Sequence, residues 1–478
     1  MALNPADSAF LQTLEQRLGP SGLRPAAPAD LEEPRGRYHG QAGAVAIPRN
    51  TDDVATIVRA AAEARVGLVP RAGGTGLVGG QVAPEGPVPL LLSLERMTQI
   101  RSVDATDNVL VAEAGAILAD VQGAAAGADR LFPLSLASEG SARIGGLLAT
   151  NAGGVQVLRY GNARDLVLGL EAVLADGAVV SGLRRLRKDN TGYDLRHLLI
   201  GSEGTLGIIT AASLRLFPQP AELATAWVTV PDPTAALHLF LSLREALGEA
   251  LSAFELMSRM GLEFVADKLP TTPVPDPAPA GWRLLIEAGS GPGAALMERL
   301  ETALGAALES GLASDALIAQ NEAQRGSFWR VRETIPEANR LIGAVASHDI
   351  SVPVAQVPAF LSAGAEALSA VDPSLRINAF GHLGDGNLHY NVFPAEDRDR
   401  DAYAGVRDEV TRVVHDLVAQ HDGSISAEHG IGRLKVADLE RYGDPTKLSA
   451  MRAIKAALDP RGILNPGAVL RLPDQDEG

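Results

Sequence analysis

A glycine-rich loop near residue 75 limits what the first half of this chain can fold into. Residues 71–80 read RAGGTGLVGG and contain the spacing G-x-G-x-x-G, beginning at Gly74. In a dinucleotide-binding βαβ unit, a helix begins at these glycines and holds the pyrophosphate at its N-terminus. Here residues 81–89 contain three prolines and lead into the strand-like residues 90–94. We therefore predict a strand, an extended loop and a second strand, which excludes a Rossmann site at this position.

Two further glycine-rich segments follow this loop, at residues 144–154 and 201–209. Without side chains, the N–H groups of such segments can surround an anion, and their backbones can approach a large flat ligand closely. Arg71 stands at the mouth of the first loop. A merely flexible glycine loop is the alternative, and the arginine makes it the weaker one. The first half of the chain thus predicts a site for a large flat ligand that carries phosphate.

Length and composition bound the class of protein. A chain of 478 residues is too long for one hydrophobic core, so we expect two or three domains, with a boundary near Pro218 and Pro220. The net charge of −16 argues against nucleic acid and anionic membranes as partners. The absence of cysteine excludes disulfides, iron–sulfur ligation and a cysteine nucleophile. Because we see neither a signal peptide nor an uninterrupted apolar run of 18 residues, we expect a cytoplasmic protein without a transmembrane segment.

Hydrophobic periodicity, together with proline and glycine breakers, predicts the order of helices and strands. Residues 221–375 alternate strand-like and helical runs, as an α+β domain does, and the prolines of residues 270–279 predict an extended surface loop. The predicted helices are 5–18, 52–65, 234–247, 291–309, 400–420 and 446–457, and the predicted strands are 66–70, 90–94, 108–114, 168–175, 178–182, 206–217, 224–230 and 283–287, with a hairpin over 377–393.

Residues 382–389 read HLGDGNLH and carry the clearest chemical signal. Asp385-Gly386 favours a two-residue type I′ turn, which would pair His382 directly with His389, on one face and with Cβ atoms roughly 4.5–5.5 Å apart. Glu428-His429 supplies a further pair of candidate ligands. Each histidine alone could be structural. Together they predict a metal site, which must rest on imidazole and carboxylate because the chain lacks cysteine.

Six segments of the chain, in unbroken order, resemble the motifs of one family. They are residues 71–80, 187–194, 201–209, 382–389, 426–430 and 464–466. They resemble the FAD-linked 2-hydroxyacid dehydrogenases, which are flavoproteins of the vanillyl-alcohol-oxidase type. The resemblance is strongest to the D-2-hydroxyglutarate dehydrogenases, with D-lactate and glycolate dehydrogenases as near relatives.

This resemblance implies an α+β fold in three parts. A two-part FAD-binding domain of the PCMH type would span residues 1–219, and an α/β substrate cap domain would span residues 220–423. A C-terminal segment, residues 424–478, would return to the flavin.

The resemblance also implies roles for single residues. His382, His389 and Glu428 would bind a divalent metal, most simply zinc, with His429 as the catalytic base. Arg332, Asn387, Ser347 and His348 would surround the substrate. FAD would be bound without a covalent link, because Thr75 stands where related loops carry a tethering histidine, and the chain has no cysteine. The implied FAD contacts are Arg71, Gly73, Gly74, Thr75, Gly76, Gly79, Gly80, Pro133, Ser138, Gly145, Asn151, Gly153, Gly154, Glu203, Gly204, Ile209 and Asn465.

Two positions near the implied substrate site depart from the hydroxyglutarate enzymes. The family pattern has threonine where Pro336 stands and lysine where Ser347 stands, and both family residues help to hold a second carboxylate. His348 and Arg340 are the cations that could replace the lysine. The departure leaves the preferred 2-hydroxy acid open.

The expected activity is oxidation of a D-2-hydroxy acid to a 2-oxo acid with hydride transfer to FAD, and D-2-hydroxyglutarate is the leading substrate. A metal chelated by the substrate lowers the pKa of its hydroxyl, and a nearby histidine can take the proton near neutral pH. The alternatives are a D-lactate or glycolate dehydrogenase, either alone or as one subunit of a complex that would require an iron–sulfur chain, or a flavin-binding subunit with a degenerate site. Expected partners are an electron-transfer flavoprotein or a quinone-type acceptor, and a homodimer is compatible with this interpretation.

Overall fold

The computed structural model describes residues 2–275 and 281–471 and divides into two compact units. The first unit comprises Met1–Gly153, Asn162–Gln219 and Glu428–Gly478, and the second comprises Gly154–Gly161 and Pro220–Ala427. The chain passes from the first unit to the second between Gln219 and Pro220.

Two details of this division differ from the sequence-based expectation. The C-terminal return begins at Glu428 rather than at residue 424, and the short segment 154–161 belongs to the second unit. The loop predicted over residues 270–279 lies partly outside the described residues.

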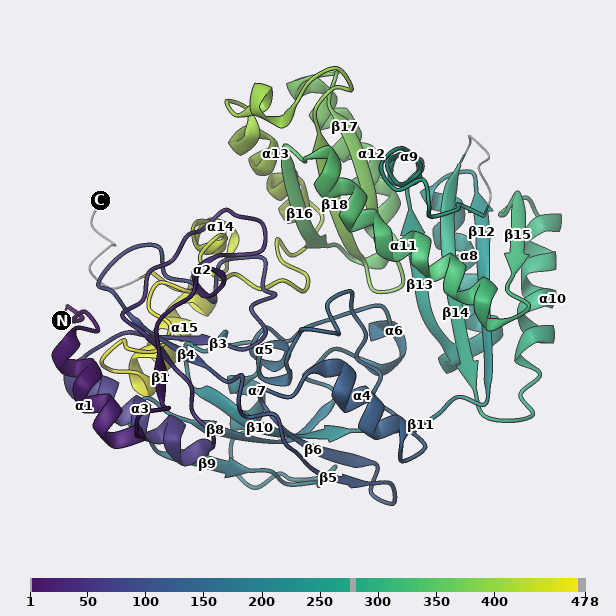
Figure 1. The fold of residues 1–478 in the computed structure, drawn as a ribbon. Helices are drawn as coiled ribbons and strands as arrows, with labels where there is room; N and C mark the ends of the chain where they lie inside the picture. Colours follow the sequence, from purple (N-terminus) through teal and green to yellow (C-terminus); the bar gives the residue numbers. More distant parts are fainter. Residues whose placement is uncertain (1, 276–280, 472–478) are drawn as a thin grey trace. The chain divides into compact units, whose positions relative to one another are not determined.

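The first unit is built on two main sheets (Figure 1). One has four strands in the order β1-β2-β4-β3, the other has five antiparallel strands in the order β5-β6-β10-β8-β9, and β7 pairs with β11. Its elements are α1 (Ser8–Leu18), β1 (Leu23–Arg24), α2 (Pro28–Leu31), β2 (Val45–Ala46), α3 (Thr51–Ala64), β3 (Leu68–Arg71), β4 (Leu90–Ser93), β5 (Ile100–Asp104), β6 (Val109–Glu113), α4 (Leu118–Ala126), β7 (Arg130–Leu131), α5 (Ile144–Ala149), β8 (Val167–Val173), β9 (Val179–Gly182), α7 (Leu195–Leu199), β10 (Ile208–Arg215), β11 (Phe217–Pro218), α14 (Val436–Tyr442) and α15 (Pro445–Leu458).

The first glycine-rich loop connects two neighbouring strands that run parallel. Leu68 of β3 lies opposite Leu90 of β4, and all four residues of β4 are buried, because this strand lies between β2 and β3. Residues 72–89, which join the two strands, contain no helix. The predicted strand–loop–strand arrangement is confirmed, and a Rossmann site is excluded here.

The second unit contains a seven-stranded antiparallel sheet with helices packed on it (Figure 1). The strand order is β15-β12-β14-β13-β17-β18-β16. Its elements are α6 (Val157–Tyr160), β12 (Glu222–Val230), α8 (Pro233–Leu247), η1 (Gly248–Ala250), β13 (Leu251–Met257), α9 (Arg259–Lys268), β14 (Trp282–Ser290), α10 (Leu296–Glu309), β15 (Asp315–Ile318), α11 (Glu322–Ile342), β16 (Ala346–Ser351), η2 (Val354–Gln356), α12 (Val357–Val371), β17 (Arg376–His382), β18 (Asn387–Phe393), η3 (Arg400–Tyr403) and α13 (Arg407–Gln420).

Among the described residues, Val354–Val371 is long and apolar enough to cross a membrane, with a mean hydropathy of 1.3. The buried residues of α12 recur at helical spacing, and Phe360 packs edge-on against Tyr390 of β18 with ring centroids 5.4 Å apart. This is the pattern of a helix that covers a sheet, so its length and apolar composition are by themselves weak evidence for a membrane span.

The β17–β18 hairpin has a longer turn than the sequence predicts. The strands pair His382 with Asn387 and Phe380 with His389, so residues 383–386 form the turn and the predicted direct pairing of the two histidines is wrong. A type I′ turn needs φ > 0 at both central residues, whereas only Gly386 (φ 83) of the Asp385-Gly386 pair has a positive φ. The two histidines lie diagonally on one face instead, with ring centroids 5.7 Å apart.

Candidate active site

The three glycine-rich segments line one cavity in the first unit. The volume of this cavity is about 140 Å³. His429, the predicted base, lines the cavity as well. The predicted FAD contacts that line it are Arg71, Gly73, Gly74, Thr75, Gly76, Gly80, Gly145, Glu203, Gly204 and Ile209.

Other predicted contacts are not among the lining residues. They are Gly79, Pro133, Ser138, Asn151, Gly153, Gly154 and Asn465. The side-chain oxygen of Asn151 accepts the N–H of Arg164 at 2.9 Å, and Gly154 belongs to the second unit. Gln81, Leu94 and Arg143 line the cavity without having been predicted. Arg143 and Gln81 had a signal in the sequence, because Arg143 directly precedes the segment 144–154 and Gln81 directly follows the segment 71–80.

Backbone geometry explains two glycines of the first loop. Gly74 has φ +70°, and a Cβ atom there would lie 2.5 Å from Nη2 of Arg71. At Gly73 a Cβ atom would lie 2.5 Å from the carbonyl oxygen of Ser141. A side chain at either position would therefore force the loop or these neighbouring atoms to shift. The Arg71 guanidinium donates to the carbonyl of Ala29 at 2.9 Å, which holds it at the edge of the loop.

Glu203 ties the C-terminal return to this cavity. Its carboxylate accepts the N–H groups of Ile431 at 2.7 Å and Gly432 at 2.8 Å. Burial raises the pKa of the Glu203 carboxyl above its ordinary value, although these two N–H donors oppose the shift. The side chain predicted to contact the cofactor thus also anchors the C-terminal segment.

Arg433 and Asn465 complete the same connection. Arg433 donates to the carbonyls of Gly79 at 3.0 Å and Gly80 at 3.2 Å, and to the side-chain oxygen of Asn465 at 3.1 Å. Asn465 donates to the carbonyls of Gly80 and Glu203 at 2.9 and 2.8 Å. Burial lowers the pKa of the Arg433 guanidinium to about 10. The first glycine loop is therefore held in place by side chains of the C-terminal segment.

In the second unit, two rows of side chains cross one face of the sheet. Directly opposed residues of antiparallel strands point to the same face, and residues two apart on a strand share it. The register therefore gathers polar side chains from four strands that are far apart in sequence. One row is Glu255, His382, Asn387 and Ser351, and the next is Met257, Phe380, His389 and Asp349.

The Glu255 carboxylate contacts two predicted site residues at once. Its Oε1 lies 2.6 Å from Nδ1 of His382, while its Oε2 accepts Nε–H of Arg332 at 2.8 Å and lies 2.7 Å from Nη2. Burial alone would raise the pKa of the Glu255 carboxyl, but the charges of His382 and Arg332 outweigh it and hold that pKa below its ordinary value. The Arg332 guanidinium also stacks over the Phe380 ring, 4.8 Å from its centroid.

Asp349 and His389 face each other in the second row. Asp349 Oδ1 lies 3.8 Å from Nδ1 of His389 and accepts the side-chain amide of Asn387 at 2.9 Å. The N–H of Ala427 donates to the carbonyl of Asp349 at 3.3 Å, and Glu428-His429 follows Ala427 directly in the chain. Glu428 therefore directly follows a residue whose backbone is bonded to Asp349.

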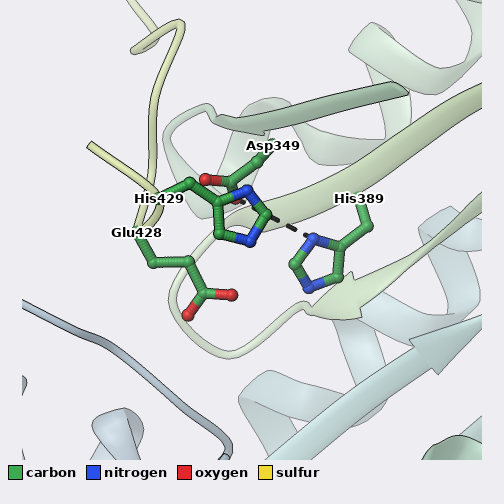
Figure 2. Close-up of side chains that lie close together, drawn as sticks. All are labelled: Asp349, His389, Glu428 and His429. Atoms are coloured by element: carbon green, nitrogen blue, oxygen red, sulfur yellow. Dashed lines mark ion pairs between the residues drawn. The ribbon is translucent and has the colours of Figure 1, made fainter. Parts of the chain in front are cut away.

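Figure 2 shows the resulting group of four side chains: Asp349, His389, Glu428 and His429. Each offers one ligand atom, and these atoms all lie within 4.8 Å of one another. Two imidazoles and two carboxylates form a donor set that suits a divalent first-row metal such as zinc. His382, the other predicted ligand, is not in this group, while Asp349 was not predicted.

The two adjacent residues Ser347 and His348, both predicted to contact substrate, point to opposite faces of β16. Ser347 pairs with Asn391, one row beyond Asp349 and on the same face. Nδ1 of His348 lies 2.8 Å from the carbonyl oxygen of Tyr390, and its ring packs against His415 on the other face. The structure therefore places the His348 imidazole away from His389.

Arg340, the other cation considered for the substrate pocket, lies near the end of α11. Its guanidinium is 67% exposed and pairs with Glu337 at 2.7 Å. Pro336 lies inside the same helix. The Arg340 guanidinium is thus engaged by Glu337, and the His348 imidazole lies on the opposite face of the sheet from Ser347.

Two buried carboxylates of the site escaped the sequence-based search, namely Glu255 and Asp349. Glu255 lies in a fully buried strand, FELM in sequence, and Asp349 lies in the polar strand SHDIS. A charged residue inside an apolar strand was the available signal for Glu255, because such a residue is almost always paired.

Comparisons with known proteins agree with these features. Residues 219–469 match the family model described as FAD linked oxidases, C-terminal domain, and residues 42–182 match the FAD binding domain. The mitochondrial D-2-hydroxyglutarate dehydrogenase of Arabidopsis thaliana is 39% identical over 434 residues, 91% of this chain and 76% of the relative. The D-2-hydroxyglutarate dehydrogenase of Xanthomonas citri pv. viticola is 37% identical over 454 residues, 94% of each chain.

Among solved structures, p-cresol methylhydroxylase with bound substrate is similar in fold. The TM-score is 0.76 at 16% identity, over 98% of this chain and 99% of that chain. At this identity the likeness concerns the fold alone. It confirms the predicted PCMH-type fold, and the family matches confirm the resemblance drawn from the motifs.

Proposed function

This chain belongs to the family of FAD-linked oxidases, and from this premise we propose that it oxidises D-2-hydroxy acids to 2-oxo acids. We propose D-2-hydroxyglutarate as the leading substrate, because two dehydrogenases named for that acid are 39% and 37% identical to this chain over 434 and 454 matched residues. The observation that carries the proposal is one sheet face on which Arg332, Glu255 and His382 lie beside Asp349 and His389.

The residues fit the requirements of this oxidation. Arg332 offers a planar guanidinium for the substrate carboxylate, since only its Nε and Nη2 edge is used by Glu255. His429 lines the cavity and is proposed to take the hydroxyl proton, for which an unperturbed imidazole pKa of about 6.5 is suitable. FAD, which we propose is held without a covalent link because Thr75 lines the cavity, supplies the hydride acceptor that no side chain can provide.

We also propose a divalent metal, zinc first, bound by His389 and Glu428 together with His382. Asp349 is added as a candidate ligand because its carboxylate belongs to the group in Figure 2. A metal there supplies a Lewis acid for the hydroxyl and carboxylate of the substrate.

Anaerobic reduction of the flavin tests the proposal directly. The holoenzyme is mixed with D-2-hydroxyglutarate, D-malate, D-lactate and glycolate, each beside its L enantiomer where one exists, and flavin absorbance is followed. We expect bleaching by D-configured acids, loss of bleaching after dialysis against a chelator, and recovery with zinc. If none of these acids bleaches the flavin, the proposed function is wrong.

A second candidate, oxidation of short acids such as D-lactate or glycolate, is favoured by the surroundings of Ser347. This neutral residue stands where the family pattern has a lysine, and the two cations considered as replacements, His348 and Arg340, are directed elsewhere. A second carboxylate held without a cation costs several kcal/mol. The ratio of kcat/KM for D-2-hydroxyglutarate and D-lactate decides between the two candidates.

A further inference from the structure

We propose that Glu255 is a positioning residue that fixes the coordinating nitrogen of His382 and the substrate-facing edge of Arg332 at the same time. The inference rests on the proposed function, because it assigns His382 to the metal and Arg332 to the substrate carboxylate. Glu255 itself would touch neither metal nor substrate. It would act on the metal through His382 and on the substrate through Arg332.

The contact with His382 determines which ring nitrogen can coordinate. Nδ1 lies 2.6 Å from Glu255 Oε1, and both side chains are buried. A hydrogen bond from one ring nitrogen to a carboxylate sets the tautomer and orientation of a ligating histidine and increases its basicity. Because Nδ1 is bonded to Glu255, coordination by His382 must use Nε2.

The contact with Arg332 determines how the guanidinium is presented. Nε and Nη2 both bind Oε2, so one edge of the planar group is fixed on β13. Phe380, in the row next to Glu255, supports the flat face of the guanidinium. The Nη1 group therefore points away from Glu255, in an orientation that a flexible arginine would not keep by itself.

Both contacts use one carboxylate, so its loss should affect metal and substrate together. The Oε1 atom serves His382 and the Oε2 atom serves Arg332. Without the negative charge, Arg332 becomes a buried cation that lacks its partner and His382 loses its orienting acceptor. A residue with a purely structural role would change stability without this paired effect.

Glu287 offers a matched control on the neighbouring strand β14. It is 1% exposed and accepts Nε–H of Arg325 and Nε1–H of Trp329, each at 2.8 Å. Both donors lie on α11, the helix that also carries Arg332. The Glu287 carboxylate thus ties the same helix to the same sheet, but its contacts are with α11 and Thr225 rather than with a proposed metal ligand.

The experiment compares Glu255→Gln and Glu287→Gln as FAD-loaded full-length proteins. Zinc affinity is measured by dialysis against buffered free zinc, KM and kcat are measured with the best D-2-hydroxy acid, and thermal unfolding is recorded. We expect Glu255→Gln to weaken zinc binding roughly 10- to 100-fold and to raise KM at least as strongly, with normal flavin absorbance. Glu287→Gln should lower the unfolding temperature while zinc affinity stays within about twofold of the wild type.

Glu255→Asp keeps the charge but shortens the side chain, and it replaces the glutamine variant if that one does not fold. Its zinc affinity and KM should lie between the wild type and the values expected for glutamine. Unchanged zinc affinity in a folded Glu255 variant overturns the inference, and so does an equal loss in Glu287→Gln. A wild-type protein that binds no zinc and bleaches with no hydroxy acid contradicts the proposed function itself.

Discussion

His389 lies between a carboxylate and an aromatic ring. Its Nδ1 is 3.8 Å from Asp349, and its ring packs against Phe380 with centroids 4.9 Å apart. These contacts hold the imidazole on the sheet face that carries the proposed metal ligands. Since the glycine-lined cavity is built entirely from residues of the first unit, a change at His389 should leave the flavin in place.

We predict that His389→Ala loses both metal and turnover but keeps FAD. Removal of a ligand should lower bound zinc at least roughly tenfold, since even changes to the partners of metal ligands cost 10- to 100-fold in affinity. Metal analysis and the flavin spectrum of the purified variant provide the measurement. His415→Ala is the control, because His415 is a buried histidine packed against His348 on the other face of the sheet. If His389→Ala turns over at the wild-type rate, the metal site is structural or absent.

A second prediction concerns Ser347. It lies on the same face as Asp349, one row further along β16, and is directly opposite the neutral residue Asn391. We expect Ser347→Lys to raise the ratio of kcat/KM for D-2-hydroxyglutarate to that for D-lactate by roughly one hundredfold, because an unpaired buried carboxylate costs several kcal/mol. Ser347→Met, which has similar length without charge, should not do so. If both variants behave alike, the position does not select the distal group of the substrate.

The roles of Glu255 and Asp349 could not be predicted from the sequence, although those of the histidines could be proposed from it. Glu255 is 127 residues from His382 and 77 residues from Arg332 in the chain. These groups meet only because strand order and register place them together, and neither was available from the sequence. The register was also wrong at the hairpin, where Asp385 does not adopt the left-handed conformation that a type I′ turn needs.

At the scale of elements, the sequence predicted strands with a clear pattern and missed those without one. All seven residues of β13 are buried, so it lacks the alternation of a half-buried strand. Helix α11 was missed because Pro336 lies in its interior, where proline usually breaks a helix. By contrast, β12 and α8 were predicted at 224–230 and 234–247 and are found at Glu222–Val230 and Pro233–Leu247.

The turn between β17 and β18 should tolerate no side chain at residue 386. Gly386 has φ 83°, and a Cβ atom there would collide with the carbonyl oxygen of Val352. We predict that Gly386→Ala destabilises the second unit by on the order of 1–3 kcal/mol from the left-handed backbone alone, with a further cost from the collision. Urea unfolding followed by circular dichroism measures the change.

Gly123 provides the control for this substitution. It lies inside α4, and a Cβ atom there meets no atom within 4 Å. Gly123→Ala should therefore stabilise the first unit by about 0.5–1 kcal/mol, since alanine favours the helix. A neutral effect of Gly386→Ala would mean that the turn adopts another conformation.

The C-terminal segment should be required for the shape of the first glycine loop. The Arg433 guanidinium donates to the carbonyls of Gly79 and Gly80 and so connects this segment to the loop. We predict that Arg433→Met raises the dissociation constant of FAD at least tenfold, which corresponds to about 1.4 kcal/mol. Fluorescence titration of the stripped protein with FAD gives the value. Arg471→Met, which removes an exposed arginine paired with Glu440, should leave it unchanged.

In the molecule as a whole, the cavity is lined by segments that lie far apart in the sequence. Residues from the segments 70–81, 142–150 and 203–209 line it, and residue 429 reaches it after the chain has completed the second unit. The order of the family motifs predicted this return, whereas hydrophobic patterns alone did not. The first glycine loop also bears on where electrons leave the protein, because without a helix it does not form a Rossmann-type site for NAD.

We expect reduced enzyme to pass electrons to an electron-transfer flavoprotein or a quinone-type dye and not to NAD. The G-x-G-x-x-G loop lacks its helix, as residues 72–89 show. A glycine-rich turn does lead from β14 into α10, but the carboxylate of Glu222 accepts the N–H groups of Gly293, Ala294 and Leu296 at 2.7, 3.0 and 2.9 Å. The position that a pyrophosphate would take at this helix N-terminus is therefore filled by a side chain of the protein.

Stopped-flow mixing of anaerobically reduced enzyme with NAD, and separately with each acceptor, tests this expectation. Flavin absorbance should return quickly with the dye or the flavoprotein and should stay bleached with NAD, while slow reoxidation by oxygen would be compatible with either outcome. Glu222→Gln provides a control, since removal of the charge that fills the α10 terminus should not create reactivity toward NAD if the geometry of the fold excludes it. Rapid NADH formation by the wild type would contradict this expectation, because without its helix the glycine loop does not form a Rossmann-type NAD site.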